Sequence, residues 1–176
     1  MKKFKTIAKV YQATLLVSTG VKLYKYNKTK ALVKDDELTD LLAKVIIERV
    51  TPIIAKDYGI DLTKVTYTQG DIYPYVFQAP ANAHGVTFTN CLIEQCHVHY
   101  FPSRIKARPL TSIQDFAYCV LEIVAHELWH VKQHQTGLDL ATLDLIKLEA
   151  PAYTKAAIKA ITYRHEVKAI LNELGL

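Results

Sequence analysis

The sequence predicts a single α+β domain in which a small sheet packs against helices, and two changes of hydrophobic period lead to this prediction. Before about residue 58 and after about residue 112, apolar residues recur at the spacing of a helix. Between these regions, residues 61–101 carry short β-branched or aromatic runs separated by Gly, Pro and Asn. A length of 176 residues with 50% hydrophobic content suits one core, so residues 1–176 are expected to form one domain.

The N-terminal third predicts helices over about residues 4–58. Apolar residues between positions 4 and 16 share one helical face, and residues 18–20 are expected to end that helix. A second helix opens with acids at Asp35, Asp36 and Glu37, where the helix dipole favours them. Pro52 is expected to kink or end this helix, and residues 57–59 predict its exit.

Four short runs predict the strands of a small sheet over about residues 61–101. They are residues 65–68, 75–77, 86–89 and 98–101. The chain then returns to helix over about residues 112–135, with Ser112 as N-cap, Asp115 in the first turn and Gly137 as the stop. A last helical region is expected over about residues 140–175, with its helix at about 151–174 and Pro151 near the first turn.

Charge and composition exclude several classes of function. The net charge is +5, but Lys and Arg are spread along the chain, so no nucleic-acid partner is expected. No stretch approaches the roughly eighteen apolar residues of a membrane span, which predicts no integral membrane segment. The basic start resembles a signal-peptide n-region, yet Lys9 and Gln12 interrupt the apolar stretch behind it. The odd cysteine count fits no disulfide framework, so a cytoplasmic location is favoured and secretion stays open.

One motif carries a specific chemistry, the stretch His-Glu-Leu-Trp-His at residues 126–130. His126 and His130 are four residues apart, so in a helix they lie one turn from each other and can bind one metal ion. Glu127 lies beside that face, where its carboxylate can act as general base on a water activated by the metal. This pattern on a helix is typical of zinc hydrolases, so the sequence predicts a Zn²⁺ site that activates water.

Catalytic zinc usually takes three protein ligands, so this site needs a third residue. In an unbroken helix His134 stands about 12 Å along the axis from His126, too far to share the ion. A metzincin arrangement requires Gly and His where this chain has Gln133 and Thr136, so that class is excluded. The downstream carboxylates remain, and they differ in how the chain must return to the site. They are Asp139, Asp144, Glu149, Glu166 and Glu173.

Among these carboxylates, Asp139 lies next to the stop at Gly137, whereas Glu149 leaves room for a reversal of the chain. Residues 126–133 (HELWHVKQ), followed by residues 148–153 (LEAPAY), resemble small bacterial and phage-type zinc metallopeptidase domains of the gluzincin kind. The resemblance covers about the C-terminal third. It implies a zincin-like fold, with His126, His130 and Glu149 as zinc ligands and Glu127 as base.

The same resemblance implies a peptide or protein substrate, with an edge strand of the sheet holding the extended chain. At one position this chain departs from the pattern of that family. Thermolysin-like gluzincins have an Asp four residues after the ligand Glu, where this chain has Tyr153, so the hydrogen-bond partner of His126 stays open. The donor that stabilises the oxyanion is expected among Tyr153, Tyr163 and His165, with Tyr153 taken as the candidate.

Three other interpretations remain beside the peptidase. Peptide deformylases combine the same helix motif with an upstream Cys ligand, and Cys91 allows a deformylase-like amidase, although no Gly precedes it. A domain that binds zinc only for stability, or a scaffold without metal, is the non-enzymatic alternative. His97 and His99 are expected on one face of the sheet, but a second metal site there would need a third ligand.

Overall fold

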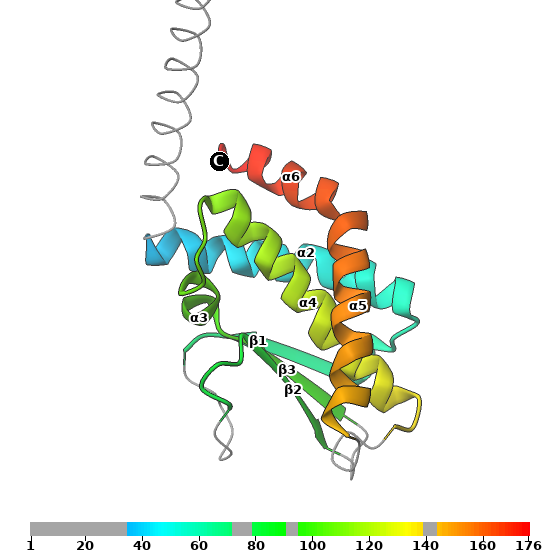
Figure 1. Cartoon of the computed structure of the whole chain (residues 1–176). Coiled ribbons are helices and arrows are strands. Elements are labelled where there is room, and N and C mark those ends of the chain that lie inside the picture. The colour runs from blue at the N-terminus through cyan, green and yellow to red at the C-terminus, as the bar shows by residue number, and fades with distance from the viewer. Residues whose placement is uncertain (1–34, 72–78, 91–94, 139–143) are drawn as a thin grey trace, which may run out of the picture.

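Helices and a small sheet alternate along the chain in the order that the hydrophobic periods predict. The computed structural model describes residues 35–71, 79–90, 95–138 and 144–176. These residues form five α-helices, one 3-10 turn and three strands (Figure 1). In chain order they are α2 (Asp36–Tyr58), η1 (Leu62–Lys64), β1 (Val65–Gln69), β2 (Gly85–Asn90), β3 (Gln95–Tyr100), α3 (Pro102–Lys106), α4 (Ile113–Gln135), α5 (Leu145–Thr162) and α6 (Arg164–Glu173).

The sheet has the strand order β1-β3-β2 and is mixed. β1 runs parallel to β3, with Val65 opposite Cys96, whereas β2 runs antiparallel to β3, with Thr87 opposite Val98. Figure 1 shows the long helices gathered on one side of this sheet. Because side chains alternate along a strand, Cys96, Val98 and Tyr100 all face the helices, and all three are buried in the core.

α4 is the central helix of the fold and contacts α2, α5 and α6 as well as the sheet. It begins at Ser112 as predicted, because the Ser112 hydroxyl accepts a hydrogen bond from the Asp115 amide at 3.0 Å. It ends before Gly137, whose φ of 83° is the left-handed conformation that glycine adopts readily. Its buried positions continue around the helix, so α4 holds the residues of the motif deep inside the domain.

α2 confirms the predicted start and exit. Asp35 caps it by accepting a hydrogen bond from the Leu38 amide at 3.0 Å, and Gly59 ends it with a φ of 64°. Pro52 does not end the helix, which runs on for more than a turn to Tyr58. The buried residues on both sides of Pro52 continue one apolar face against α4, and this packing outweighs the hydrogen bond that a proline removes.

The C-terminal region differs from its prediction. Instead of one helix from about residue 151, α5 begins at Leu145, because Asp144 caps it by accepting from the Ile146 amide at 3.1 Å. Pro151 therefore lies inside α5 and not in its first turn. A break at Tyr163 separates α5 from α6, and α6 buries Val167 and other apolar residues against the rest of the core.

Two smaller differences complete the comparison. The short helix α3 was not predicted, and β3 begins at Gln95, three residues before the predicted strand. The helix expected at residues 4–16 and the strand expected at residues 75–77 lie outside the described residues. Within the described ranges, none of the helices has the length and apolar character needed to cross a membrane.

Candidate metal centre

Three side chains from two helices converge at one point. The Nε2 atoms of His126 and His130 on α4 lie 3.1 Å apart. From α5, Glu149 brings Oε2 to 3.2 Å from Nε2 of His126 and Oε1 to 3.5 Å from Nε2 of His130. Helix α5 packs extensively on α4, and this packing brings Glu149, nineteen residues after His130, back to the motif.

The spacing of these atoms is of the size that a bound divalent cation requires. Ligand atoms at about 2.0–2.2 Å from a tetrahedral ion lie about 3.3–3.6 Å from one another. The two Nε2 atoms are 3.1 Å apart, and they lie 3.2 and 3.5 Å from different oxygens of the Glu149 carboxylate. Among the described residues this is the one group of three or more His, Cys, Asp or Glu whose donor atoms converge, and its composition suits zinc without excluding other divalent cations.

Gln133 orients one of the two imidazoles, a role that the motif did not reveal. The His130 Nδ1–H donates to Oε1 of Gln133 at 2.8 Å, so the lone pair of His130 is on Nε2, the atom that faces Glu149. The amide of the same Gln133 donates to the carbonyl oxygen of Leu148 at 3.1 Å. One buried amide therefore sets the tautomer of His130 and holds α5 in place beside Glu149.

His126 has no such partner. Its Nδ1 atom is buried without a hydrogen-bond partner among the described residues. The ring of Tyr153 lies against it, with 4.6 Å between ring centroids, but the tyrosine offers no acceptor to Nδ1. Burial, and next the neighbouring His130, lower the pKa of His126 to about 4. His126 is therefore a neutral imidazole at neutral pH, which is the form that binds a metal.

Glu127 projects from α4 toward strand β2 and is almost fully buried. The Thr87 hydroxyl donates to Oε2 of Glu127 at 2.8 Å, and the Glu127 carbonyl oxygen lies 3.1 Å from the same hydroxyl. The pKa of Glu127 is raised to about 8. Burial is the largest cause, the hydrogen bond from Thr87 acts against the rise, and the charge of Glu149 adds to it. The carboxylate thus has the pKa of a group that can accept and release a proton near neutral pH.

Gly85 makes room for this carboxylate. A Cβ atom at position 85 would lie 2.8 Å from Cγ and 2.9 Å from Oε1 of Glu127, closer than packed carbon atoms approach. The absence of a side chain at Gly85 therefore lets β2 and α4 approach closely enough for Thr87 to reach Glu127. Neither Gly85 nor Thr87 belongs to a sequence motif, so only the packing of β2 on α4 identifies them.

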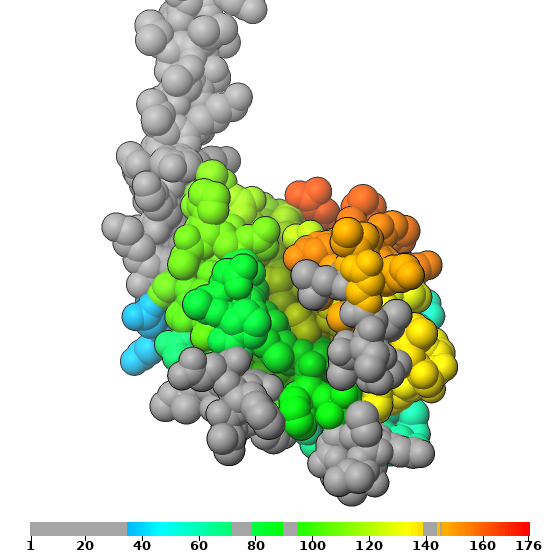
Figure 2. Space-filling view, turned by 60° about the horizontal axis from the view of Figure 1, so that its bottom comes forward, coloured from blue at the N-terminus to red at the C-terminus, as the bar shows by residue number. Residues whose placement is uncertain are grey.

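An open cleft of about 740 Å³ lies above these groups. Its floor is α4, one wall is the segment of residues 80–87 with the start of β2, and the other wall is α5. Figure 2 shows it as the hollow between the green segment and the orange α5. The residues His126, Glu127, His130, Glu149 and Tyr153 all line it, so the candidate metal centre is accessible from solvent.

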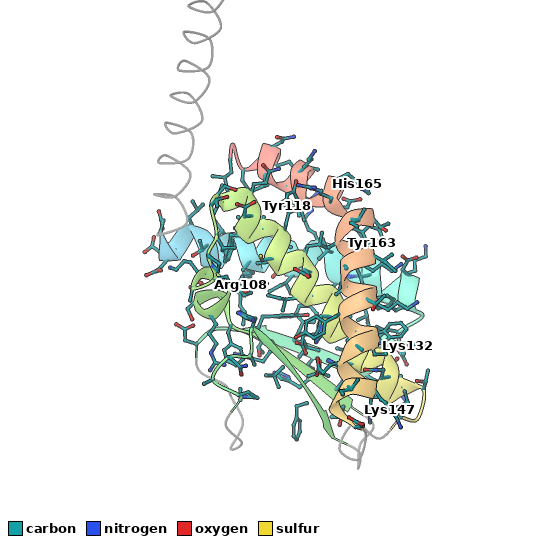
Figure 3. All side chains as sticks on the ribbon, in the orientation of Figure 1. Arg108, Tyr118, Lys132, Lys147, Tyr163 and His165 are labelled. Carbon is teal, nitrogen blue, oxygen red and sulfur yellow. The ribbon has the colours of Figure 1, made fainter. Side chains whose placement is uncertain are left out.

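The other residues predicted from the sequence lie elsewhere. Tyr163 donates its hydroxyl to Asp57, and His165 is exposed beside Glu166. Figure 3 shows Tyr163 and His165 at the opposite end of α5 from Lys147, which lies close to Glu149 in the chain. Neither residue lines the cleft. Of the three candidates, Tyr153 alone lies beside His126.

The other residues considered as a third metal ligand do not join the converging group where the structure describes them. Asp144 caps α5 and does not belong to the converging group, and neither does the half-buried His134. Asp139 and Cys91 lie outside the described residues. Glu166 and Glu173 lie on α6, outside the cleft lining.

His97 and His99 do lie on one face of the sheet, as predicted, opposite the face that packs on the helices. Their rings bind threonines of the neighbouring strand β1. His97 lies 2.8 Å from the hydroxyl of Thr66 and 2.9 Å from that of Thr68, and His99 lies 2.7 Å from that of Thr68. No third ligand joins them among the described residues, so the structure provides no second metal group there.

Comparisons with protein-family models, with curated proteins and with solved structures found no match to this chain. No family is therefore assigned to it, and its function rests on the geometry of its own residues.

Proposed function

We propose that this protein is a zinc-dependent peptidase that hydrolyses peptide bonds with Glu127 as general base. The observation that carries the proposal is the position of Glu127, which lines the same open cleft as the converging group of His126, His130 and Glu149 and is held by Thr87 of strand β2. A site that binds metal only for stability has no need of a buried carboxylate with a raised pKa beside its ligands.

Each residue has a separate task in this proposal. His126, His130 and Glu149 would hold the zinc ion, which when bound supplies the Lewis acidity that activates a water and polarises a carbonyl. Glu127 takes the proton of the attacking water and later delivers it to the leaving amine. Thr87 keeps the carboxylate of Glu127 turned toward the cleft, and Gly85 leaves it room. Tyr153 is the candidate donor to the developing oxyanion.

The cleft suits an extended peptide. β2 is an edge strand of the described sheet, and Gly85 to Thr87 lie both on this strand and in the wall of the cleft. An edge strand has backbone groups that can pair with an added chain. A peptide bound antiparallel or parallel to β2 would carry its backbone past Glu127, which supports a peptide over a compact small molecule as substrate.

The decisive experiment is the Glu127→Gln substitution with zinc content and hydrolysis measured on the same preparation. Because Gln keeps the shape of Glu127 but accepts no proton, we expect kcat to fall by about 10²–10⁴ while zinc remains stoichiometric. Glu48→Gln, an exposed position on α2, is the matched control and should retain full activity. Unchanged hydrolysis in Glu127→Gln, or a purified chain that binds no zinc, would contradict the proposal. Retained zinc without hydrolysis in the native protein would favour a non-catalytic zinc domain.

A further inference from the structure

One arginine in the cleft has no task in the mechanism above. Arg108 follows helix α3 and lines the same cleft as the metal centre (Figure 3). Its backbone is held in place, since its N–H donates to the carbonyl oxygen of Ile105 at 3.2 Å and its own carbonyl accepts from Leu110 at 2.7 Å. Ile105 is fully buried, so the half-buried Arg108 side chain projects from a firm base into the cleft wall.

Among the described residues, the guanidinium of Arg108 has no partner, in contrast to that of Arg104. Arg104 donates to the carbonyl oxygens of Pro80 and Ala83 at 2.8 and 3.1 Å, and it stacks on the ring of Phe101. It therefore braces the loop that forms the wall. For Arg108, no carboxylate lies within ion-pair distance in the part of the chain that the structure describes, and its side chain donates no hydrogen bond there. Five donor positions are thus free to bind a ligand.

Positive charge acts on the groups around Arg108. Burial first, and then the charges of Arg108 and Arg104, lower the pKa of His84, which lines the same cleft. Burial raises the pKa of the Cys119 thiol, and the charge of Arg108 acts against that rise. Three acids also line the cleft: Glu127 and Glu149 lie at the candidate metal centre, and Glu122 on α4 makes no ion pair with Arg108 among the described residues. A ligand beside Arg108 is therefore next to a cationic group of the cleft.

Arg108 shares the cleft with the candidate metal centre, because both line the same cavity of about 740 Å³. An extended peptide advances about 3.3 Å per residue. A peptide bound along this cleft can therefore present one of its groups to Arg108 while another part lies at the candidate metal centre.

We propose that Arg108 forms an anion-binding subsite of the cleft that selects peptides carrying a carboxylate near the scissile bond. The carboxylate is that of an acidic side chain or of a free C-terminus, and both present the planar pair of oxygens that a guanidinium binds with two hydrogen bonds. This inference rests on the proposed peptidase function for the meaning of "scissile bond", but the carboxylate selectivity can be measured as binding alone.

The test measures the affinity of peptides for the full chain by fluorescence anisotropy. The protein carries the Glu127→Gln substitution and is loaded with zinc. The peptides are about ten residues long and carry a fluorescein label. A neutral Ala/Leu peptide carries one Glu or one Gln at each position in turn, with a free or an amidated C-terminus. We expect the best Glu peptide, or the free C-terminus, to bind about five- to tenfold more tightly than its neutral counterpart at low salt. The free and amidated arms show which carboxylate is used.

The contrast should disappear in Arg108→Gln and turn into a preference for Lys in Arg108→Glu. Lys147→Gln is the matched control, because Lys147 is an exposed cation on α5 outside the cleft lining. Equal affinities for charged and neutral peptides, a contrast that persists in Arg108→Gln, or a native preference for Lys through Glu122 would overturn the subsite. Carboxylate selectivity with no hydrolysis by the native zinc protein would leave the subsite standing and refute the peptidase. Hydrolysis without carboxylate selectivity would refute the subsite and leave the peptidase standing.

Discussion

Two pairs of histidines lie in this domain, and their surroundings differ in one respect. His126 and His130 on α4 turn their Nε2 atoms toward each other and toward Glu149, with 3.1 to 3.5 Å between the donor atoms. His97 and His99 on β3 are buried as well, but their ring nitrogens face threonine hydroxyls and a backbone carbonyl. The first pair keeps lone pairs available for a metal, whereas the second uses its nitrogens in the sheet.

The hydrogen-bond chain on the sheet can be traced atom by atom. His99 donates its Nε2–H to the carbonyl oxygen of Gly70 at 2.9 Å, so its Nδ1 accepts from the Thr68 hydroxyl. That hydroxyl in turn accepts from the Nε2–H of His97, whose Nδ1 accepts from Thr66. Both rings are held neutral in this chain, and burial lowers the pKa of each. The comparison teaches that two close histidines are available to a metal only where each keeps one ring nitrogen that no threonine or backbone group occupies.

The largest expected difference between the pairs is in metal affinity. Substituting His130→Ala removes a lone pair from the converging group, and we expect zinc affinity to fall by about a thousandfold or more. His97→Gln, which keeps hydrogen-bonding capacity near Thr66 and Thr68, should change it by less than about threefold. Competition with a chromophoric chelator measures both. Comparable losses in the two variants would mean that the sheet histidines take part in metal binding.

The second difference is in acid stability. His126 has a folded pKa of about 4 against an ordinary value of 6.5, so the unfolded chain binds more protons between these pH values and stability falls as pH decreases through them. For the metal-free protein this amounts to on the order of 3 kcal/mol. His97 and His99 act in the same direction, because their pKa values are also lowered.

Glu127 has the opposite effect, since its raised pKa of about 8 costs stability as pH rises from 4.5 toward 8. The free energy of unfolding should therefore be measured in a protein that already carries Glu127→Gln. Denaturant unfolding with a chelator present, between about pH 4 and pH 7.5, gives this free energy. We expect His126→Gln to remove the larger part of the remaining pH dependence, and the double substitution His97→Gln with His99→Gln to remove the smaller part. A pH-independent free energy of unfolding in that background would show that these rings are not held neutral by burial.

The smallest expected effect comes from a residue that orients a proposed zinc ligand without binding the ion itself. Gln133→Ala removes the acceptor of the His130 Nδ1–H and one tie between α4 and α5, and we expect zinc affinity to fall about 10–100-fold. Gln135→Ala is a matched control on the same helix, because its side chain binds the backbone of Asp61 and not the site. Equal zinc affinities in the two variants would show that Gln133 only fills space.

The helices were predictable wherever the signal was local. Ser112 and Gly137 mark the ends of α4 through hydrogen bonds and backbone conformations that involve only neighbouring residues. The prediction was wrong for Pro151, which lies inside α5 and not in its first turn. Of the two expectations for Pro52, the end of the helix is contradicted, because α2 continues to Tyr58. Apolar residues next to each proline are buried against other elements, and the sequence around a proline does not state what will pack there.

For the site, the sequence by itself determined the spacing of His126, Glu127 and His130, since four residues make one turn in any helix. Glu149 was proposed from a resemblance, and its arrival depends on the packing of α5 on α4. Thr87, Gly85 and Arg108 were not found, because they belong to no motif and lie far in the chain from the groups beside them. Gln133 was part of the stretch compared with the peptidases, but its two hydrogen bonds, to His130 and to Leu148, became visible only in the packed structure.

The tertiary structure also decided which histidines and carboxylates keep free lone pairs. Helical periodicity is a local property that neighbouring residues establish, so a sequence states it directly. Desolvation and hydrogen-bond competition depend on every element packed around a group, and these are known only once β2, α4 and α5 have come together.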